Sequence, residues 1–413
     1  MNTFTTIFLT LLAVMLLAQL WLARRHARYI AAHRGAVPAA FRGKVPLKAH
    51  RKAADYTVAR TRFGAVEDVL AAALLLAWTL GGGLEWLDRL WRASGLGELA
   101  TGTGFLVSVF VIMALIELPT AVYQTFVLES RFGFNRVTPA LFVADLLKKT
   151  VLMMLLGIPV AAAVLWVMQE TGTLWWFYAW LLWVGFSLFM IWAYPTLIAP
   201  LFHRFTPLKQ GDIRRRIHAL LKRTGFRSRG VFVIDSSRRT THGNAYFSGL
   251  GRAKRIVFFD SLLKTLSVRE IEAVLAHELG HFKLSHVLKR MALLFAMSFA
   301  GLAGLGWLMT QDWFYRGLGV AHPSAHAALM LFLLVGPVFS FFLQPLLAWG
   351  SRRHEYEADG FAAEETSARA LVNALVKLYK ENASTLTPDP LHSAFYDSHP
   401  PAARRIARLL GKL

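Results

Sequence analysis

Residues 277–281 read His-Glu-Leu-Gly-His. On a helix, residues four apart lie on one face, so His277 and His281 can ligate a single metal ion. Glu278 projects about 100° away from His277, near the ion but outside its ligand shell. A carboxylate in that place can take a proton from a zinc-activated water. The pentapeptide therefore predicts the site of a zinc hydrolase.

The residues before this motif predict the helix that the chemistry requires. Ser267 and Glu270 form a capping-box pattern, in which Ser267 is the N-cap and Glu270 reaches back to it. Apolar residues then recur at a helical period, at Ile271, Val274, Leu275 and Leu279. The alternative, two histidines on a solvated helix face, leaves the glutamate between them without a role.

A third ligand is expected far downstream, among the acidic residues 355–359. Glu355 and Asp359 are four apart on a predicted helix, so one can bind the metal while the other orients a ligating imidazole. Glu357 is expected to point elsewhere, and a solvated acidic helix start is the alternative for the whole cluster. His286 lies half a turn out of phase with His277, which predicts a solvated or membrane-edge histidine. The chain has no cysteine, so the ligands must be nitrogen and oxygen.

The composition surrounding this site is that of a membrane protein. The 413 residues are 55% hydrophobic, which is too apolar for one soluble domain. Several apolar runs are long enough to cross a bilayer core. We identify seven, at about 5–23, 69–87, 104–126, 150–168, 174–195, 291–310 and 327–349. The run at 291–310 is rich in Ala and Gly, and a buried soluble helix is the alternative there.

Charge predicts the topology of these spans. Residues 1–23 carry no Lys or Arg, whereas Arg24, Arg25 and Arg28 follow directly, which is typical of a retained anchor with its N-terminus outside. Basic and weakly charged connections then alternate, which predicts a cytoplasmic C-terminus and places His277, His281 and Glu355 on the cytoplasmic side. A bacterial inner membrane and an endoplasmic reticulum fit this pattern equally well.

The net charge of +21 does not predict nucleic-acid binding, because the basic residues flank apolar spans, where anionic lipid attracts them. The expected partners are therefore the lipid bilayer and a peptide or protein substrate, and no nucleic acid. The sequence leaves the oligomeric state open.

The chain divides into four expected parts. Residues 1–200 are a membrane region with five spans, 201–290 a cytoplasmic α+β segment with the zinc helix, 291–349 two further spans, and 350–413 a cytoplasmic helical segment that completes the site. Residues 231–234 and 255–259 are predicted strands. The segment 241–247 between them is either an edge to which an extended peptide adds by main-chain pairing, or an ordinary hairpin.

Taken in order, these motifs resemble the type I CAAX prenyl endopeptidases, integral-membrane zinc proteases of the a-factor-converting kind. The resemblance covers most of the chain. It includes residues 129–135, 200–202, 205–208, 242–247, 254–257, 277–281, 355–359 and 399–401. Residues 130–131 and Asp397 depart from the family pattern, which bears on substrate choice and not on the metal.

The resemblance implies a fold and roles for single residues. The fold is an α-helical polytopic membrane protein, with seven transmembrane helices enclosing a chamber and a small cytoplasmic α+β, gluzincin-like zinc protease domain. The metal ligands are His277, His281 and Glu355, with Asp359 behind them and Glu278 as general base. The remaining site residues are His399 and Arg405, which help hold the substrate or the oxyanion, and Asn244 and Ala245 on the substrate-side strand.

The implied activity is zinc-dependent removal of the tripeptide that follows a prenylated cysteine. A protease that cuts unfolded membrane proteins with the same site is the alternative among enzymes. A transporter or receptor with a structural metal is the alternative of another class. Glu117 favours a transporter or receptor, because carboxylates within membrane spans are usually functional. Glu278 speaks against it, because a structural zinc site has no use for a free base.

Overall fold

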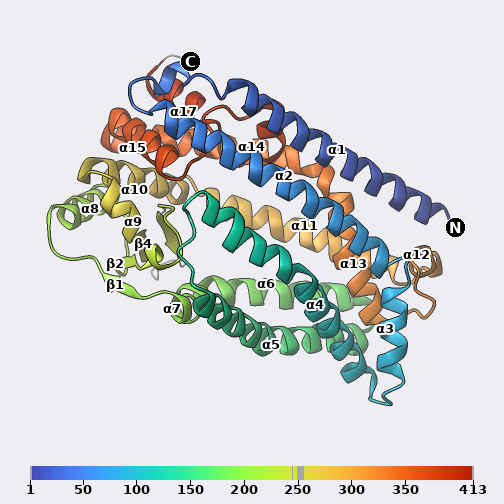
Figure 1. Cartoon of the computed structure of the whole chain (residues 1–413). Helices are drawn as coiled ribbons and strands as arrows, with labels where there is room; N and C mark the ends of the chain where they lie inside the picture. The colour runs from blue at the N-terminus through green and yellow to red at the C-terminus, as the bar shows by residue number, and fades with distance from the viewer. Residues whose placement is uncertain (1, 244, 249–254, 412–413) are drawn as a thin grey trace.

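The computed structural model describes residues 2–243, 245–248 and 255–411, and Asn244 therefore lies outside the described residues. Long helices run side by side from one end of the molecule to the other, and a small α+β domain covers one end (Figure 1). The long helices are α1 Thr3–His33, α2 Leu47–Trp78, α4 Glu98–Tyr123, α5 Pro139–Glu170, α6 Trp175–Ala193, α11 His286–Leu308, α13 Ala325–Ser340 and α14 Gln344–Ala362. Shorter ones are α3 Gly83–Arg92, α7 Ala199–Phe202, α12 Asp312–Gly317, α15 Ala368–Glu381, α16 Pro390–Tyr396 and α17 Ala402–Leu409.

The predicted apolar runs are mostly helical, and a turn at residues 79–82 interrupts the run at 69–87. In the described part of the chain, six helices are long and apolar enough to cross a membrane, and a seventh span results if α2 and α3 are taken together. These two helices meet at an angle of 48°, where Gly82 adopts a left-handed φ of +79°. Multi-pass membrane insertion and the seven expected spans are thus confirmed, including the Ala- and Gly-rich run in α11.

Two boundaries differ from the expectation. The helices α1 and α2 extend well beyond their apolar runs into the basic stretch 24–64, where they pack against each other. The last span is not one straight helix, because a 3-10 turn at Phe341–Leu343 separates α13 from α14. In this way α14 continues from the membrane into the domain that carries Glu355.

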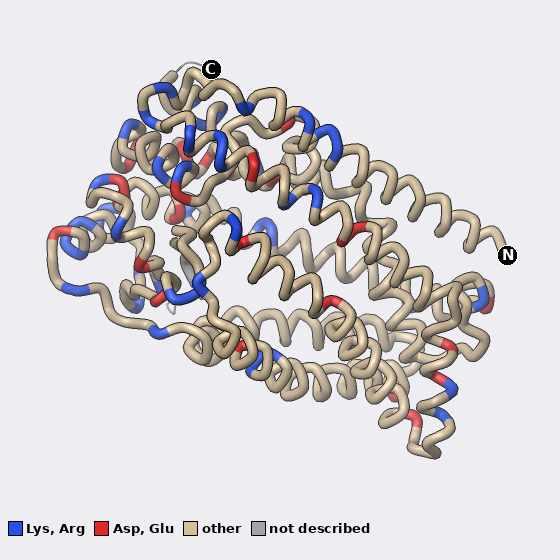
Figure 2. The backbone as a smooth tube through the Cα atoms, in the orientation of Figure 1, with Lys and Arg blue, Asp and Glu red and all other residues tan. Residues whose placement is uncertain are grey.

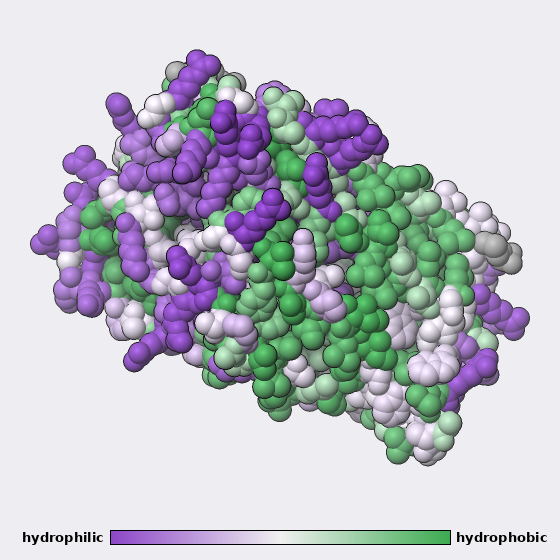
Figure 3. All heavy atoms as spheres, in the orientation of Figure 1, coloured by the Kyte–Doolittle hydropathy of each residue, from purple (hydrophilic) through white to green (hydrophobic). Residues whose placement is uncertain are grey.

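Helices α4 and α5 have buried residues at only one end of the bundle. A buried hydrophobic cluster there takes residues from α1 to α6 and from α11 to α13, among them Phe8, Trp78, Phe105, Leu165 and Leu331. Toward the other end α4 and α5 have no buried residue: none of α5 before Leu165 is buried, and none of α4 after Val109. An outward face in lipid and an inward face on a chamber account for that pattern, and Figure 3 shows an apolar surface across the visible face of the bundle.

The small domain closes the open end of the bundle. Its sheet has the strand order β1-β2-β4-β3, with β1 Phe205–Pro207, β2 Val231–Ile234, β3 Ala245–Ser248 and β4 Arg255–Phe259. Helices α8 Asp212–Arg223, α9 Asp260–Thr265 and α10 Val268–Lys283 complete it. The two predicted strands have the expected bounds. β1 is too short for a periodicity signal and was not predicted, while β3 forms an antiparallel pair with β4 and ends the described sheet.

Candidate active site

The motif helix α10 forms as the sequence predicts. Its capping box is present, with the Ser267 backbone N–H donating to Glu270 at 2.7 Å. Gly280 then lets α10 approach α14 closely, because a Cβ at this position would lie 3.0 Å from the Cα of Ala358. The glycine within the pentapeptide thus has a packing role, which is to bring α14 against the two histidines.

This close approach brings together the three predicted ligands. Glu355 Oε2 lies 3.4 Å from His277 Nε2, and Glu355 Oε1 lies 3.3 Å from His281 Nε2. One ligand atom from each of the three residues can be chosen so that all lie within 4.8 Å of one another. Since His277 is 7% exposed and Glu355 is 4% exposed, the cluster is not a solvated acidic surface.

The cluster fits a metal cation. Glu355 Oε2 is buried and has no hydrogen-bond partner among the described residues, which is costly unless another group compensates it. Burial disfavours the charged form of His277, but the nearby carboxylates of Asp359 and Glu355 outweigh it and raise the pKa of His277 to about 9. The site therefore favours a positive charge between the carboxylate and the two imidazoles.

Asp359 holds the first histidine from behind. Its Oδ1 lies 2.9 Å from His277 Nδ1, the ring nitrogen that faces away from Glu355. Arg405 on α17 donates to both oxygens of Asp359, through Nε at 2.8 Å and Nη2 at 2.5 Å. Its Nη1 lies 3.6 Å from Glu355, and the guanidinium is buried. Arg405 thus places one buried positive charge beside the two carboxylates, Asp359 and Glu355.

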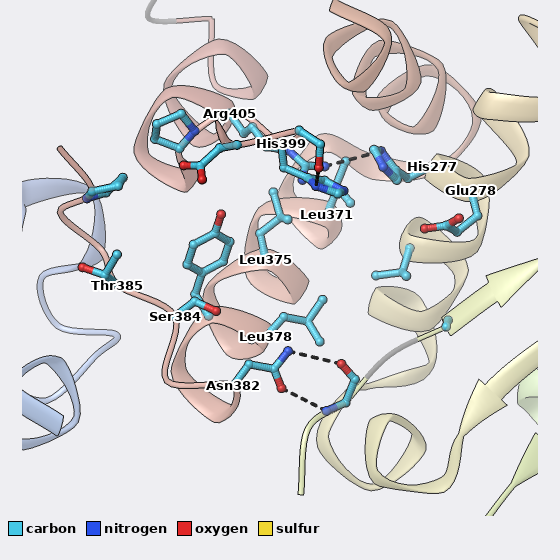
Figure 4. A pocket seen from close by; sticks show the side chains of 18 of the residues that line it. His277, Glu278, Leu371, Leu375, Leu378, Asn382, Ser384, Thr385, His399 and Arg405 are labelled. Carbon is cyan, nitrogen blue, oxygen red and sulfur yellow. Dashed lines mark hydrogen bonds between the residues drawn. The ribbon is translucent and has the colours of Figure 1, made fainter. Parts of the chain in front are cut away.

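Glu278 and His399 line the cavity beside the cluster. Glu278 lies on α10 next to His277, and burial raises the pKa of its carboxyl. His399 comes from the loop before α17; its side chain is 60% exposed, and its Nε2 lies 3.4 Å from Glu355 Oε1. Figure 4 shows His277 and Glu278 on one side of this cavity and His399 and Arg405 near them on another. All four are thus near one place where a peptide bond can be held.

The strand beside the site is fixed by a residue that the sequence did not single out. Asn382, directly after α15, accepts from Gly243 N–H at 2.9 Å and donates to Gly243 C=O at 3.2 Å (Figure 4). These two bonds imitate strand pairing just before β3, whose first residue is Ala245. β3 pairs antiparallel with β4 and lies at the edge of the described sheet, which agrees with both alternatives for residues 241–247.

The structure corrects one expectation about the outer residues. His286 was expected at the solvent or the membrane edge, yet it is 3% exposed and its Nδ1 lies 3.1 Å from Nδ1 of His281. Glu357 points away from the three predicted ligands, as expected, and its Oε2 lies 2.9 Å from His286 Nε2. Helical phase relative to His277 was the wrong guide, because α10 ends at Lys283 and His286 begins a new helix.

Sequence comparisons place the whole chain in a family. Residues 26–204 match the family model described as "CAAX prenyl protease N-terminal, five membrane helices", and residues 207–412 match "Peptidase family M48". A CAAX prenyl protease 1 homolog from Arabidopsis thaliana is 35% identical, over 91% of this chain and 91% of the relative. CAAX prenyl protease 1 of Saccharomyces cerevisiae is 30% identical, over 90% and 88% of the two chains.

A solved structure agrees with this assignment. The crystal structure of S. mikatae Ste24p superposes with a TM-score of 0.90 at 27% identity and covers 99% of both chains. Such agreement over the whole length includes the membrane helices as well as the α+β domain, so the transporter or receptor alternative is excluded. The chain is an integral-membrane metalloprotease and belongs to peptidase family M48, among the CAAX prenyl proteases of type 1.

Proposed function

We propose that this protein is a zinc endopeptidase that removes the C-terminal tripeptide following a prenylated cysteine, with His277, His281 and Glu355 as the metal ligands. The observation that carries the proposal is the buried carboxylate Glu355 facing both imidazoles of α10. Two nitrogens and one oxygen that leave a position open are typical of catalytic and not of structural zinc.

The residues around the metal have separate tasks. A zinc ion held here would polarise the scissile carbonyl and acidify a water molecule. Glu278 would accept the proton of the attacking water and deliver it to the leaving amine. His399, whose ring faces the cavity, would donate a hydrogen bond to the oxygen on which negative charge develops. Asp359 keeps the His277 ring in place, and Arg405 places one positive charge beside the two buried carboxylates.

The walls of the site favour a substrate with a lipid part and a peptide part. One cavity of about 740 Å³, the α6-side cavity, contains His281 and Glu278; Met190, Ile191, Tyr194, Pro195 and Val287 form an apolar wall, and Arg290, Ser351 and His354 also line it. Another of about 540 Å³, the α15-side cavity, contains His277 and Glu278; Leu371, Leu375 and Leu378 line it together with polar groups from Tyr379, Asn382, Ser384 and Thr385. Because Glu278 lines both, a scissile bond at the metal has apolar surface for a lipid and hydrogen-bonding groups for a peptide within reach.

Peptide release by the purified protein tests the substrate. A synthetic peptide ending in farnesyl-cysteine and three further residues should lose that tripeptide, detected by mass spectrometry. If the protein buries a part of the farnesyl group equal to about four methylene groups, this burial contributes about 3 kcal/mol to substrate binding, or roughly a hundredfold in affinity. The same peptide without the farnesyl group should therefore have a kcat/KM lower by about that factor. Equal rates for both peptides contradict the prenyl assignment but leave the protease intact.

A quality-control protease with the same site is the second candidate. The chamber above the α+β domain favours it, because such a space can admit an extended chain as well as a lipid. An unfolded membrane-protein fragment distinguishes the two candidates: cleavage at many positions, at rates above those for the farnesylated peptide, supports this second function.

We further propose that the metal site and the C-terminus are cytoplasmic and that the N-terminus is outside. Figure 2 shows Lys and Arg gathered at the end of the bundle that carries the α+β domain, as the positive-inside rule requires. Reporter fusions in the α1–α2 connection, after Gly43, and at the C-terminus should report the cytoplasm. A fusion after Gly95, between α3 and α4, should report the opposite side. An external C-terminal reporter contradicts this orientation.

A further inference from the structure

The turn between α10 and α11 folds His286 back onto the metal site. Ser285 connects the two helices with a left-handed backbone, φ 59° and ψ 25°, which is uncommon for a residue other than glycine. This turn redirects the chain, so that the first residue of α11 lies against the last turn of α10. His286 is buried there, at 3% exposure, although a membrane helix begins with it.

Two hydrogen-bonding contacts connect Glu357 through His286 to His281, one of the proposed metal ligands. The Nε2 of His281 faces Glu355 at 3.3 Å, and its Nδ1 lies 3.1 Å from Nδ1 of His286. The other nitrogen of His286, Nε2, lies 2.9 Å from Oε2 of Glu357. Arg353 occupies the second oxygen of Glu357 at 3.1 Å, which favours its ionised form.

These contacts allow one arrangement of protons when a metal is bound. A ligating His281 Nε2 must be unprotonated, so Nδ1 of the neutral ring carries the hydrogen and donates it. His286 Nδ1 is then the acceptor, and the proton of His286 is on Nε2, where it is donated to Glu357. Each ring nitrogen of His281 and His286 then has one defined role.

The arrangement parallels that of the other ligating histidine. His277 Nδ1 contacts Asp359 directly, whereas His281 Nδ1 contacts Glu357 through one intervening imidazole. The helix α14 thus supplies both outer carboxylates as well as the ligand Glu355. Outer partners of this kind fix ring orientation and increase ligand basicity.

We infer that His286 and Glu357 are positioning residues that hold His281 in its metal-binding orientation. The inference rests on the proposed function, since it requires a metal at His277, His281 and Glu355. Loss of such an outer partner typically weakens metal binding by about 10- to 100-fold.

The same residues do not favour a second metal site. His286, His354 and Glu357 offer ligand atoms within 4.8 Å of one another. However, the rings of His286 and His354 are stacked, with centroids 4.1 Å apart and planes inclined by 10°. Lone pairs on imidazole nitrogens lie in the ring plane, so those of two parallel rings do not converge on one ion. We therefore assign His354 to packing against His286.

Zinc affinity of the full-length protein in detergent tests the inference, measured by competition with a chromogenic chelator. His286→Leu removes the acceptor at similar volume and should weaken zinc binding by about 10- to 100-fold. His286→Asn should restore most of the affinity, because the amide oxygen can take the place of Nδ1. The absorption spectrum of the cobalt-substituted protein should shift in the Leu variant and return toward wild type in the Asn variant.

Two controls separate positioning from stability. His326→Asn breaks a buried contact of 2.6 Å with Asp88 at the opposite end of the bundle, so it should lower Tm and leave zinc affinity unchanged. His277→Ala should lose the metal outright; if it does not, the proposed ligand set itself is wrong. If His277→Ala loses zinc while His286→Leu keeps wild-type affinity and cobalt spectrum, the positioning role alone is overturned. Two zinc ions in the wild type and one in His286→Leu would also overturn it, in favour of a second site.

Discussion

Replacing Glu355 with alanine is expected to remove the metal from the protein and to abolish peptidase activity. The variant loses one of three protein ligands and, among the described residues, the one carboxylate that faces both His277 and His281. It also leaves Arg405 opposite a single carboxylate, Asp359. Metal analysis of the purified chain should fall from about one zinc per molecule to almost none, as expected when a three-ligand site loses a ligand.

The thermal midpoint gives a second readout of the same variant. A ligand that binds only the folded state stabilises it, by about 4 kcal/mol at a thousandfold excess over its Kd. A strong chelator should therefore lower Tm of the wild type and leave Tm of Glu355→Ala unchanged. Glu364→Ala, an exposed glutamate just beyond α14, serves as the matched control and should keep both zinc and the response to chelator. Full zinc occupancy in Glu355→Ala would falsify the ligand assignment.

The sequence pattern of a segment was sufficient to predict its secondary structure wherever that structure depends on the segment alone. The strands of residues 231–234 and 255–259 and the capping box at Ser267 follow from β-branched runs and short-range hydrogen bonds, and all three formed as predicted. The pairing of α10 with α14 was also predictable, because a two-histidine site lacked a third ligand and residues 355–359 offered one.

Contacts that depend on the geometry of a turn or on distant segments could not be predicted from the sequence pattern. The left-handed backbone of Ser285 determines that His286 faces His281. A helical wheel counted from His277 assumes one continuous helix and therefore places His286 wrongly. Asn382 contacts Gly243, which is distant along the chain and follows no periodic pattern that would identify it. Hydropathy likewise predicts the number of membrane spans but not whether the spans pack together at the centre of the bundle. The chamber was therefore predicted from the family resemblance and not from the composition.

Replacing Glu278 with glutamine is expected to stop turnover while the metal stays bound. Glutamine is nearly isosteric with glutamate but cannot accept the proton of the attacking water, and general acid–base catalysis typically contributes about 10²- to 10⁴-fold to the rate. Since none of the three proposed ligands is changed, zinc content should equal that of the wild type. Turnover of a farnesylated peptide, measured with metal analysis on the same sample, checks both parts.

The matched control lies on the same helix. Glu272 pairs with Arg216 at 3.3 Å on the side of α10 that faces α8, outside the two cavities that Glu278 lines. Glu272→Gln makes the same chemical change and should keep turnover near wild type, because Glu272 lies outside both cavities and pairs with Arg216 and Arg223, away from the proposed ligands. If Glu278→Gln retains turnover like Glu272→Gln, another group accepts the proton. If Glu278→Gln instead loses zinc, its carboxylate supports the metal and its role as base is not separable from binding.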